Sequence, residues 1–210
     1  MSQKTWAAAA VTFGFGVLSF GCQSGGIGDP CVPEDEYQQF FAGYSETEVN
    51  MESRSFQCET RLCLVNHFRG RVSCPYGQTQ AEATTPTKPD YQLCHIPGTT
   101  GHTAPNDNQI KVEVNKQLDG RLAKNTVYCS CRCNGADTAA RYCKCPTGFQ
   151  CVPLLNTIKG LGGTELAGSY CVQEGTEYDV GSNPGAPCQE EKPSASIDEA
   201  PGHCGTYDGH

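Results

Sequence analysis

Apolar residues form short runs along this chain of 210 residues, and the longest run lies near the N-terminus. It covers residues 6–20, follows the basic residue Lys4, and is interrupted only by Thr, Ser and Gly. A helix of this length, at about 1.5 Å per residue, is too short to cross a hydrocarbon core of about 30 Å. A basic start, a short apolar middle and small residues before a cleavage site are typical of a secretory signal peptide. The pattern therefore predicts that residues 1–21 are a signal peptide and that the chain is exported.

A second periodic pattern predicts one short helix over residues 33–43. Pro33 suits the first helical position, the acidic residues 34–36 suit the positive end of a helix, and Gly43 suits its end. Aromatic side chains fall at positions i, i+3, i+4 and i+7, which places them on one face of the helix. We expect that face to pack in the core, with a binding surface as the alternative. The aromatic residues are Tyr37, Phe40, Phe41 and Tyr44.

The remaining apolar residues alternate with polar ones or form runs of a few residues, as in the strands of small sheets. Strands are expected within residues 49–76, over residues 110–114 ahead of a turn at 118–120, from Val127 onward, and at residues 169–172. No long amphipathic helix is indicated anywhere in the mature chain.

Two polar segments rich in Gly, Pro, Thr or Ser accompany these strands. Residues 77–109 are expected to form a long loop and residues 174–210 a tail, each ordered only through its cysteines. The predicted organisation is a disulfide-rich domain over residues 33–173, followed by the tail. The predicted fold class is a small disulfide-rich fold, mainly β-hairpins and coil with one short N-terminal helix.

Cys22 directly follows the apolar segment and is one of 15 cysteines. The sequence Leu-Ser-Phe-Gly-Cys that ends there resembles the lipobox of bacterial lipoproteins: Gly21 and Cys22 match it, while Leu18 lies one place too early. The resemblance implies a diacylglyceryl group and usually an N-acyl chain on Cys22, and two or more chains anchor a protein stably. Ser19 and Gly21 also suit an ordinary signal peptidase, which would release a secreted protein. We expect lipidation, with residues 22–32 as a tether, because free secretion would leave an odd cysteine.

Once Cys22 is acylated, 14 cysteines remain, which is enough for seven disulfides in an oxidising compartment. Bulky aliphatic residues are sparse, so crosslinks worth about 2–4 kcal/mol each are expected to supply much of the stability. Proximity favours a bond between Cys188 and Cys204. It also favours bonds between two strands with the Cys-x-Cys pattern, at residues 129–133 and 143–145. Because successive side chains of a strand point to opposite faces, the cysteines of each strand all lie on one face. The two strands would thus offer five thiols on facing surfaces. The 14 cysteines are Cys31, Cys58, Cys63, Cys74, Cys94, Cys129, Cys131, Cys133, Cys143, Cys145, Cys151, Cys171, Cys188 and Cys204.

The dense cysteines between residues 129 and 145 raise other possibilities. Zinc binding would need reduced thiols, which export disfavours. A thioredoxin-like dithiol or a covalent haem site would need a Cys-x-x-Cys motif, and the chain contains none. The segment from Cys143 to Cys151 resembles the second half of an EGF-type module, in which Cys-x-Cys precedes a Gly-aromatic turn and another Cys, and this supports a small disulfide-tied hairpin. We expect structural disulfides throughout, with no metal and no cofactor.

The formal net charge of −8 is spread over scattered acidic residues and argues against nucleic acid or anionic headgroups as partners. The sequence lacks a Gly-x-Ser-x-Gly elbow, a His-Glu-x-x-His motif, an EF-hand loop and a phosphate loop. We therefore assign no catalytic residue and expect that the protein is not an enzyme.

As a whole, the N-terminus and the Cys-x-Cys pattern resemble the cysteine-rich lipoproteins of gliding, predatory Gram-negative bacteria, which implies an outer-membrane location, periplasmic or surface-exposed. The predicted function is a non-catalytic envelope lipoprotein, acting as a surface binding or structural module. Its predicted partners are the membrane, through Cys22, and a protein or polysaccharide ligand. The alternative is an exported protease inhibitor or hydrolase that uses a disulfide-pinned loop. A binding module predicts an exposed apolar patch near the aromatic residues, and an enzyme predicts a deep pocket with converging polar groups.

Overall fold

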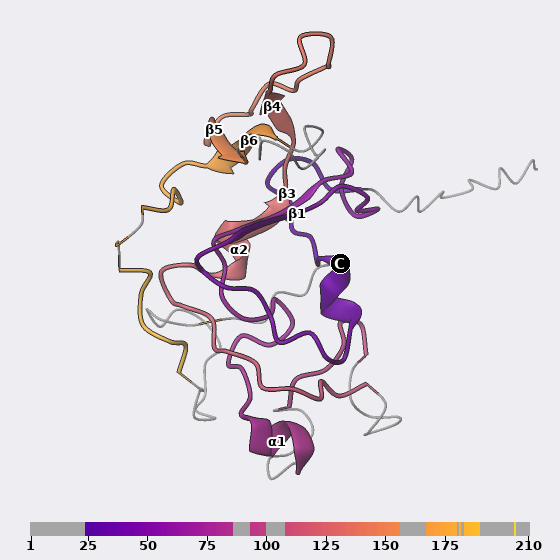
Figure 1. Cartoon of the computed structure of the whole chain (residues 1–210), viewed down its shortest axis with the longest axis vertical. Coiled ribbons are helices and arrows are strands. Elements are labelled where there is room, and N and C mark those ends of the chain that lie inside the picture. Colours follow the sequence, from indigo (N-terminus) through magenta and orange to yellow (C-terminus); the bar gives the residue numbers. More distant parts are fainter. Residues whose placement is uncertain are drawn as a thin grey trace, which may run out of the picture.

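The computed structural model describes residues 24–85, 93–99, 108–155, 167–179, 181, 183–189 and 204. The predicted signal peptide and Cys22 lie outside the described residues. Within them, the strands are short and antiparallel and form two three-stranded sheets, and each helix has at most five residues (Figure 1). The predicted fold class, small, disulfide-rich and mainly β, is confirmed.

The first sheet lies near the middle of the molecule (Figure 1) and has the strand order β1-β2-β3. Its strands are β1 (Val49–Glu52), β2 (Cys63–Asn66) and β3 (Val127–Cys129). Every residue of the central strand β2 is buried. Because side chains alternate between the faces of a strand, Cys63 and Val65 join one core cluster, whereas Leu64 joins another. The first sheet is therefore covered on both faces.

The second sheet has the strand order β4-β6-β5 and lies at one end of the molecule (Figure 1). Its strands are β4 (Arg132–Asn134), β5 (Phe149–Leu155) and β6 (Gly168–Gln173). Tyr128 of β3 packs in one cluster with residues of β6, and its hydroxyl accepts a hydrogen bond from the backbone N–H of Gln173 at 2.9 Å. This buried tyrosine joins the two sheets.

The predicted helix over residues 33–43 is present only as η1 (Glu34–Tyr37), a 3₁₀ turn. Gln38 already has extended backbone angles. The buried guanidinium of Arg71 explains this early end, because it donates hydrogen bonds to the carbonyls of Glu36, Gln38 and Phe41. Carbonyls bound to a side chain from another part of the fold are not available to continue a helix.

The early end of η1 separates the four aromatic side chains that the sequence analysis placed on one face. Tyr44 is buried and Phe41 packs against the same core cluster. Tyr37 and Phe40 are exposed. The expectation of a single core-facing stripe is therefore wrong for two of the four residues, and these two lie on the surface.

Two further helices were not predicted. The helix α1 (Gln80–Thr84) lies within the predicted loop at 77–109 and begins with a capping box in which Thr79 and Glu82 bind each other's backbone N–H groups. The helix α2 (Ala123–Thr126) leads directly into β3. Among the described residues, no helix has the length and apolar character that would span a membrane.

The predicted strand at residues 110–114 does not form: the chain bends at Val112, and the described pairings at its ends are isolated bridges, of the preceding Gln109 with His95 and of Val114 with Gln78. The reason lies in Gln78, whose side-chain amide donates hydrogen bonds to the carbonyls of Ile110 and Val112. A side chain thus occupies the place that a neighbouring strand would take.

The 14 cysteines after Cys22 form seven disulfides, as predicted, with Cα–Cα distances from 5.3 to 6.3 Å. The bond between Cys188 and Cys204 is confirmed. Cys94, expected to pin the long loop, bonds to Cys74. The pairs are Cys31–Cys63, Cys58–Cys129, Cys74–Cys94, Cys131–Cys143, Cys133–Cys151, Cys145–Cys171 and Cys188–Cys204.

The expected pair of facing Cys-x-Cys strands is only partly correct. Cys131 bonds to Cys143, but Cys129 belongs to the first sheet and bonds to Cys58. The chain leaves the first sheet after Cys129 and enters the second at Arg132, so its neighbouring cysteines serve different sheets. The EGF-like segment does not close on itself either, because each of its cysteines bonds to a residue outside it, namely Cys131, Cys133 or Cys171.

Candidate functional site

The candidate site is a surface groove with a volume of about 790 Å³. One wall comes from the segment that contains η1 together with Glu52, the last residue of β1, whose carboxylate is hydrogen-bonded to the backbone of Glu34, and the other comes from the loop over residues 53–61. We call it the aromatic groove, defined by Val32, Glu34, Tyr37, Glu52, Ser53, Arg54, Phe56, Gln57 and Arg61.

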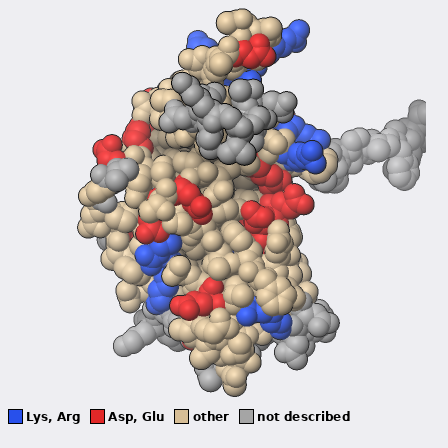
Figure 2. Space-filling model, in the orientation of Figure 1, with Lys and Arg blue, Asp and Glu red and all other residues tan. Residues whose placement is uncertain are grey.

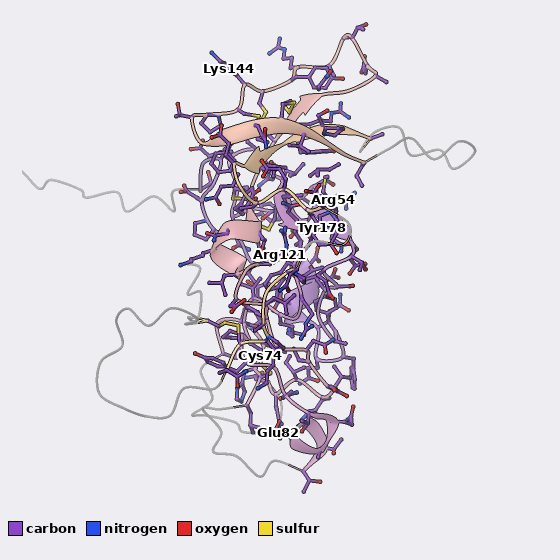
Figure 3. The ribbon with its side chains drawn as sticks, turned by 90° about the vertical axis from the view of Figure 1, so that its left-hand side faces the viewer. Arg54, Cys74, Glu82, Arg121, Lys144 and Tyr178 are labelled. Carbon is purple, nitrogen blue, oxygen red and sulfur yellow. A yellow bond between two sulfur atoms is a disulfide. The ribbon has the colours of Figure 1, made fainter. Side chains whose placement is uncertain are left out.

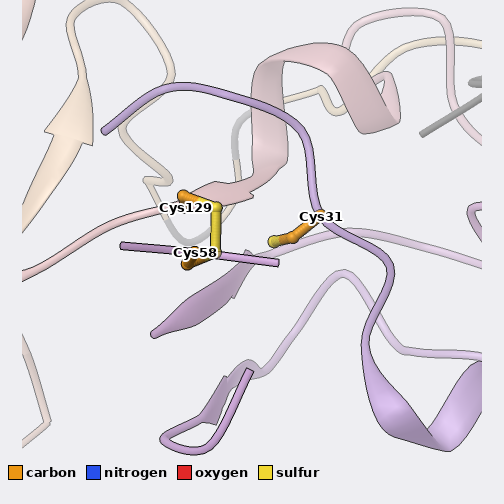
Figure 4. Close-up of side chains that lie close together, drawn as sticks. All are labelled: Cys31, Cys58 and Cys129. Atoms are coloured by element: carbon orange, nitrogen blue, oxygen red, sulfur yellow. A yellow bond between two sulfur atoms is a disulfide. The ribbon is translucent and has the colours of Figure 1, made fainter. Parts of the chain in front are cut away.

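Two disulfides fix the walls of the aromatic groove to the first sheet. Cys31, next to Val32, bonds to Cys63 of β2, and Cys58, next to Gln57, bonds to Cys129 of β3. Figure 4 shows Cys31 beside the bond between Cys58 and Cys129. The sulfurs of these three residues lie within 4.8 Å of one another. Both walls are therefore anchored at almost the same point of the sheet.

The side chain of Gln57 joins the two walls directly. Its amide nitrogen donates a hydrogen bond of 2.7 Å to the carbonyl of Val32, and its amide oxygen accepts one of 3.0 Å from the backbone N–H of Val32. This paired contact fixes the spacing of the walls at the base of the groove without using any charged side chain.

Aromatic rings at the groove are unusually open to solvent. Phe56 is 79% exposed and Tyr37 is 48% exposed, and Phe40, just beyond η1, is 74% exposed. Large apolar side chains left in water on a rigid loop mark interaction surfaces more often than single scattered ones do. Tyr37 and Phe56 line the groove itself, whereas Phe40 is outside its lining.

Arg61 is held in a strained backbone conformation beside Phe56. Its φ of 62° lies in the left-handed region, which costs a non-glycine residue about 1–2 kcal/mol. Backbone hydrogen bonds with Ser55 and Cys58 maintain it. In this position its guanidinium lies 4.2 Å from the centre of the Phe56 ring. The turn thus places an exposed cation on an exposed ring.

The opposite wall is acidic. A carboxylate oxygen of Glu52 accepts a hydrogen bond of 3.0 Å from the backbone N–H of Glu34. Burial raises the pKa of the Glu52 carboxyl, and the nearby charges of Glu34 and Asp35 raise it further. Burial also raises the pKa of the Tyr37 hydroxyl, with added effects from Glu52 and Glu36. The carboxylates of this wall therefore lie in a negative potential that would favour a cation.

The described residues show no ion pair between the acidic and basic side chains of the groove, whose members include Glu34, Glu52, Arg54 and Arg61. Figure 2 shows Asp and Glu side chains scattered over one face of the molecule, with Lys and Arg side chains among them. Figure 3 places Arg54 near the middle of the molecule's length, below the second sheet. Acidic and basic side chains thus line one groove without forming an ion pair among the described residues.

A buried ion pair supports the acidic wall from within. Glu36 of η1 and Arg71 are fully buried, with 3.3 Å between the Arg71 Nε and a carboxylate oxygen of Glu36. Glu36 also accepts hydrogen bonds from the backbone N–H groups of Val72 and Ser73 and from the Ser73 hydroxyl. Burial raises the pKa of Glu36 and lowers that of Arg71, while each charge opposes the effect on the other. This network fixes η1, which carries Glu34 and Tyr37.

Three groups of cysteine sulfurs lie within metal-binding distance of one another, each group spanning no more than 4.8 Å. Every member of these groups is in a disulfide, so none offers a thiolate as a ligand. The groups are Cys31, Cys58 and Cys129; Cys131, Cys143 and Cys171; and Cys133, Cys145 and Cys171.

The close sulfurs of the second sheet predict thiol–disulfide exchange after partial reduction. The sulfur of Cys171 lies 3.6 Å from that of Cys131 and 3.8 Å from that of Cys143. It also lies within 4.8 Å of Cys133, whose partner Cys151 is exposed. A thiolate freed at Cys133 can attack a neighbouring disulfide, forming one S–S bond as it breaks another.

To test this, the protein is partly reduced, its free thiols are alkylated, and the molecules that carry two alkyl labels are analysed by mass spectrometry. We expect some of these molecules to contain new bonds among the cysteines of the second sheet, such as Cys133–Cys171. The matched control is Cys188–Cys204 in the same molecules, because no third described sulfur contacts that pair. Native bonds alone in every two-label species would contradict the prediction.

Sequence reasoning identified the cysteines and Tyr37 as candidates but missed Phe56, Arg54 and Arg61. Cys22 lies outside the described residues, and its lipidation stays a prediction. The groove joins residues 32–37 to residues 52–61, and no periodic pattern connects the two segments. A local signal existed only in Phe56, a large apolar residue in an otherwise polar stretch.

A scan against protein-family models finds no match, and comparisons with curated proteins and with solved structures find none either.

Proposed function

We propose that this protein is an exported, lipid-anchored module of the cell envelope that binds a partner through the aromatic groove and catalyses no reaction. The observation that carries the proposal is the exposure of Phe56 and Tyr37 on walls that two disulfides fix to one sheet. A rigid surface loses little conformational entropy when it binds. The lipid at Cys22 would keep this surface at the membrane.

The polar groups of the groove support binding over catalysis. Glu52 and Gln57 are engaged with backbone groups, and Arg61 is stacked on a ring. No histidine is among the residues that line the groove. General acid–base catalysis needs a titratable group aimed at the reacting atoms. Here the titratable groups lie on separate walls, which suits recognition of a ligand with several contacts.

The groove is tested by sedimenting the Cys22→Ala protein, which lacks acyl chains, with washed Gram-negative envelope fragments that contain both protein and polysaccharide. Binding should fall at least severalfold in the Phe56→Ala/Arg61→Ala variant. The matched control is Arg141→Ala/Lys144→Ala, which also removes exposed side chains, in the region that Figure 3 marks with Lys144 beyond the second sheet. Equal sedimentation of the two variants would contradict the proposal.

The anchor has its own test, because Cys22→Ala removes the only sulfur that the lipobox-like sequence offers for acylation. Expressed in a Gram-negative host fed with labelled palmitate, the unchanged protein should carry label and fractionate with membranes. Cys22→Ala should carry none. Complete recovery of the unchanged protein, unlabelled, in the soluble fraction would show that the chain is secreted without lipid.

A further inference from the structure

We infer that the aromatic groove binds an extended segment of a partner protein that carries a basic residue at one end and an acidic residue at the other, with an apolar side chain between them. This inference rests on the proposed function and specifies its ligand. Its basis is the distribution of charge and aromatic surface over the two walls.

The acidic wall suits a lysine or arginine of the partner. Glu52 is held by the Glu34 backbone, so its carboxylate cannot turn away from the groove without losing that hydrogen bond. Asp35 also lies close enough to raise the pKa of Glu52. The buried cation Arg71 is paired with Glu36. A cation arriving from solvent would relieve the repulsion among these carboxylates.

The basic wall suits a carboxylate of the partner. The guanidinium of Arg61 covers one face of the Phe56 ring, and a planar guanidinium in this position presents its N–H donors along its edge. Such an edge matches a carboxylate through two parallel hydrogen bonds. Arg54 lines the same groove and is exposed. The wall therefore offers two cations to one anionic group.

The groove cannot neutralise these charges by itself. Glu52 and Arg54 are two positions apart at the end of β1, yet the described residues show no ion pair between them. Arg61 is held against Phe56 and by its own backbone turn. A ligand with a single charge would satisfy one wall and face the other unpaired. A ligand with both charges satisfies both walls.

A polysaccharide is the competing ligand, because sugar rings also stack on aromatic side chains. Sugars of one charge sign would leave one wall unsatisfied, and an acidic polysaccharide would meet an acidic protein of net charge −8. Peptides carry both signs on neighbouring side chains, and their apolar residues can cover Phe56 and Tyr37, which are exposed. These features favour a peptide segment.

The experiment titrates the isotope-labelled Cys22→Ala protein with peptides while its backbone amide NMR shifts are recorded. The probes are acetylated and amidated peptides with Lys and Asp separated by Leu and by zero to four Gly. In the control peptides Gln replaces Lys, or Asn replaces Asp. We expect shifts at groove residues with the bipolar peptides. Each neutral replacement should weaken binding about two- to fivefold, as for exposed ion pairs.

A charge reversal distinguishes recognition by the groove from non-specific electrostatic binding. Arg54→Glu/Arg61→Glu should lose the preference for the bipolar peptide and prefer peptides with Lys at both ends. The matched control Arg141→Glu/Lys144→Glu changes the net charge by the same amount outside the groove and should keep the original preference. An identical change of preference in both variants would show that net charge, not the groove, selects the peptide.

The remaining outcomes distinguish the inference from the proposed function. Shifts at groove residues with chitotetraose or oligogalacturonate, and none with any bipolar peptide, would overturn the peptide ligand and leave the groove as a binding site. No shift with any probe would also overturn the inference. Envelope sedimentation that depends on Phe56 and Arg61 would then still support the proposed function.

Discussion

Reduction of all seven disulfides is expected to unfold the domain under conditions in which the oxidised protein is stable. The largest described core cluster has eleven buried residues, of which four are cysteines. Removing their bonds takes away crosslinks worth about 2–4 kcal/mol each, against a typical domain stability of about 5–15 kcal/mol. The remaining apolar clusters are small. They are not expected to compensate for the chain entropy that the crosslinks suppress.

The loss of stability should depend on which disulfide is removed. Cys58–Cys129 joins residues 71 positions apart, and Cys188–Cys204 joins residues 16 apart. A loop of the first size corresponds to about 4 kcal/mol of loop-closure entropy in the unfolded chain. In addition, Cys58 and Cys129 are core residues of the first sheet. Replacing this pair by serine should lower the unfolding midpoint far more than replacing Cys188 and Cys204.

Circular dichroism in the near and far ultraviolet checks both expectations, with thiol titration to confirm complete reduction. A chelator without reductant should leave the spectrum unchanged, because all of the described cysteines are paired in disulfides. A spectrum that survives reduction of every bond would show that apolar packing alone holds the fold.

Arg71→Met is expected to lower the free energy of unfolding by about 3–5 kcal/mol, the range for removing one partner of a buried ion pair. The change leaves the fully buried carboxylate of Glu36 without an opposite charge. It also removes the donor that binds the carbonyls of Gln38 and Phe41. Both losses act on the segment that forms one wall of the aromatic groove.

Urea unfolding under oxidising conditions measures the free energy of unfolding of the Arg71→Met variant. The matched control is Arg61→Met, which removes an exposed arginine and should change the stability by no more than about 0.5 kcal/mol. The double variant Glu36→Gln/Arg71→Met should recover part of the loss, because it no longer buries an unpaired charge. An unfolding midpoint of Arg71→Met equal to that of the unchanged protein would refute the structural role given to this pair.

The fold class could be predicted from the sequence because it depends on local and countable features. The even number of cysteines after Cys22 predicted complete pairing, and the short apolar runs predicted strands near Val127 and at residues 169–172, where β3 and β6 lie. The capping box of Thr79 and Glu82 was also readable but was overlooked within a segment interpreted as loop. Such signals need only residues close in sequence.

The early end of η1 and most of the disulfide pairing could not be predicted, because both depend on residues far away in sequence. Arg71, whose guanidinium ends η1, lies 30 to 35 positions after the residues whose carbonyls it binds. Cys58 reaches across 71 positions to Cys129. Cys151 and Cys171 lie opposite each other in β5 and β6 yet bond to other cysteines, so even correct strand pairing would have suggested a wrong bond.

The aromatic groove could not be predicted either, because its two walls come from segments that are separate in sequence. Phe56 and Tyr37 belong to segments that meet where Cys31–Cys63 and Cys58–Cys129 end on neighbouring strands. Sequence analysis could expect an aromatic binding surface as an alternative, but not the arginines beside it. The central claim is therefore that these two crosslinks hold the two walls of the groove together.

Mass spectrometry of a tryptic digest made without reduction, with free thiols blocked, tests that claim most directly. Trypsin separates Cys31, Cys58 and Cys63 into different peptides, because arginines stand at positions 54, 61 and 69. The account predicts that the peptide with Cys31 is linked to residues 62–69 alone, and that residues 55–61 are linked to residues 125–132. A link between the peptides of Cys31 and Cys58, or a blocked thiol at Cys31, Cys58, Cys63 or Cys129, would contradict it; Cys22 shares the peptide of Cys31 and is not counted.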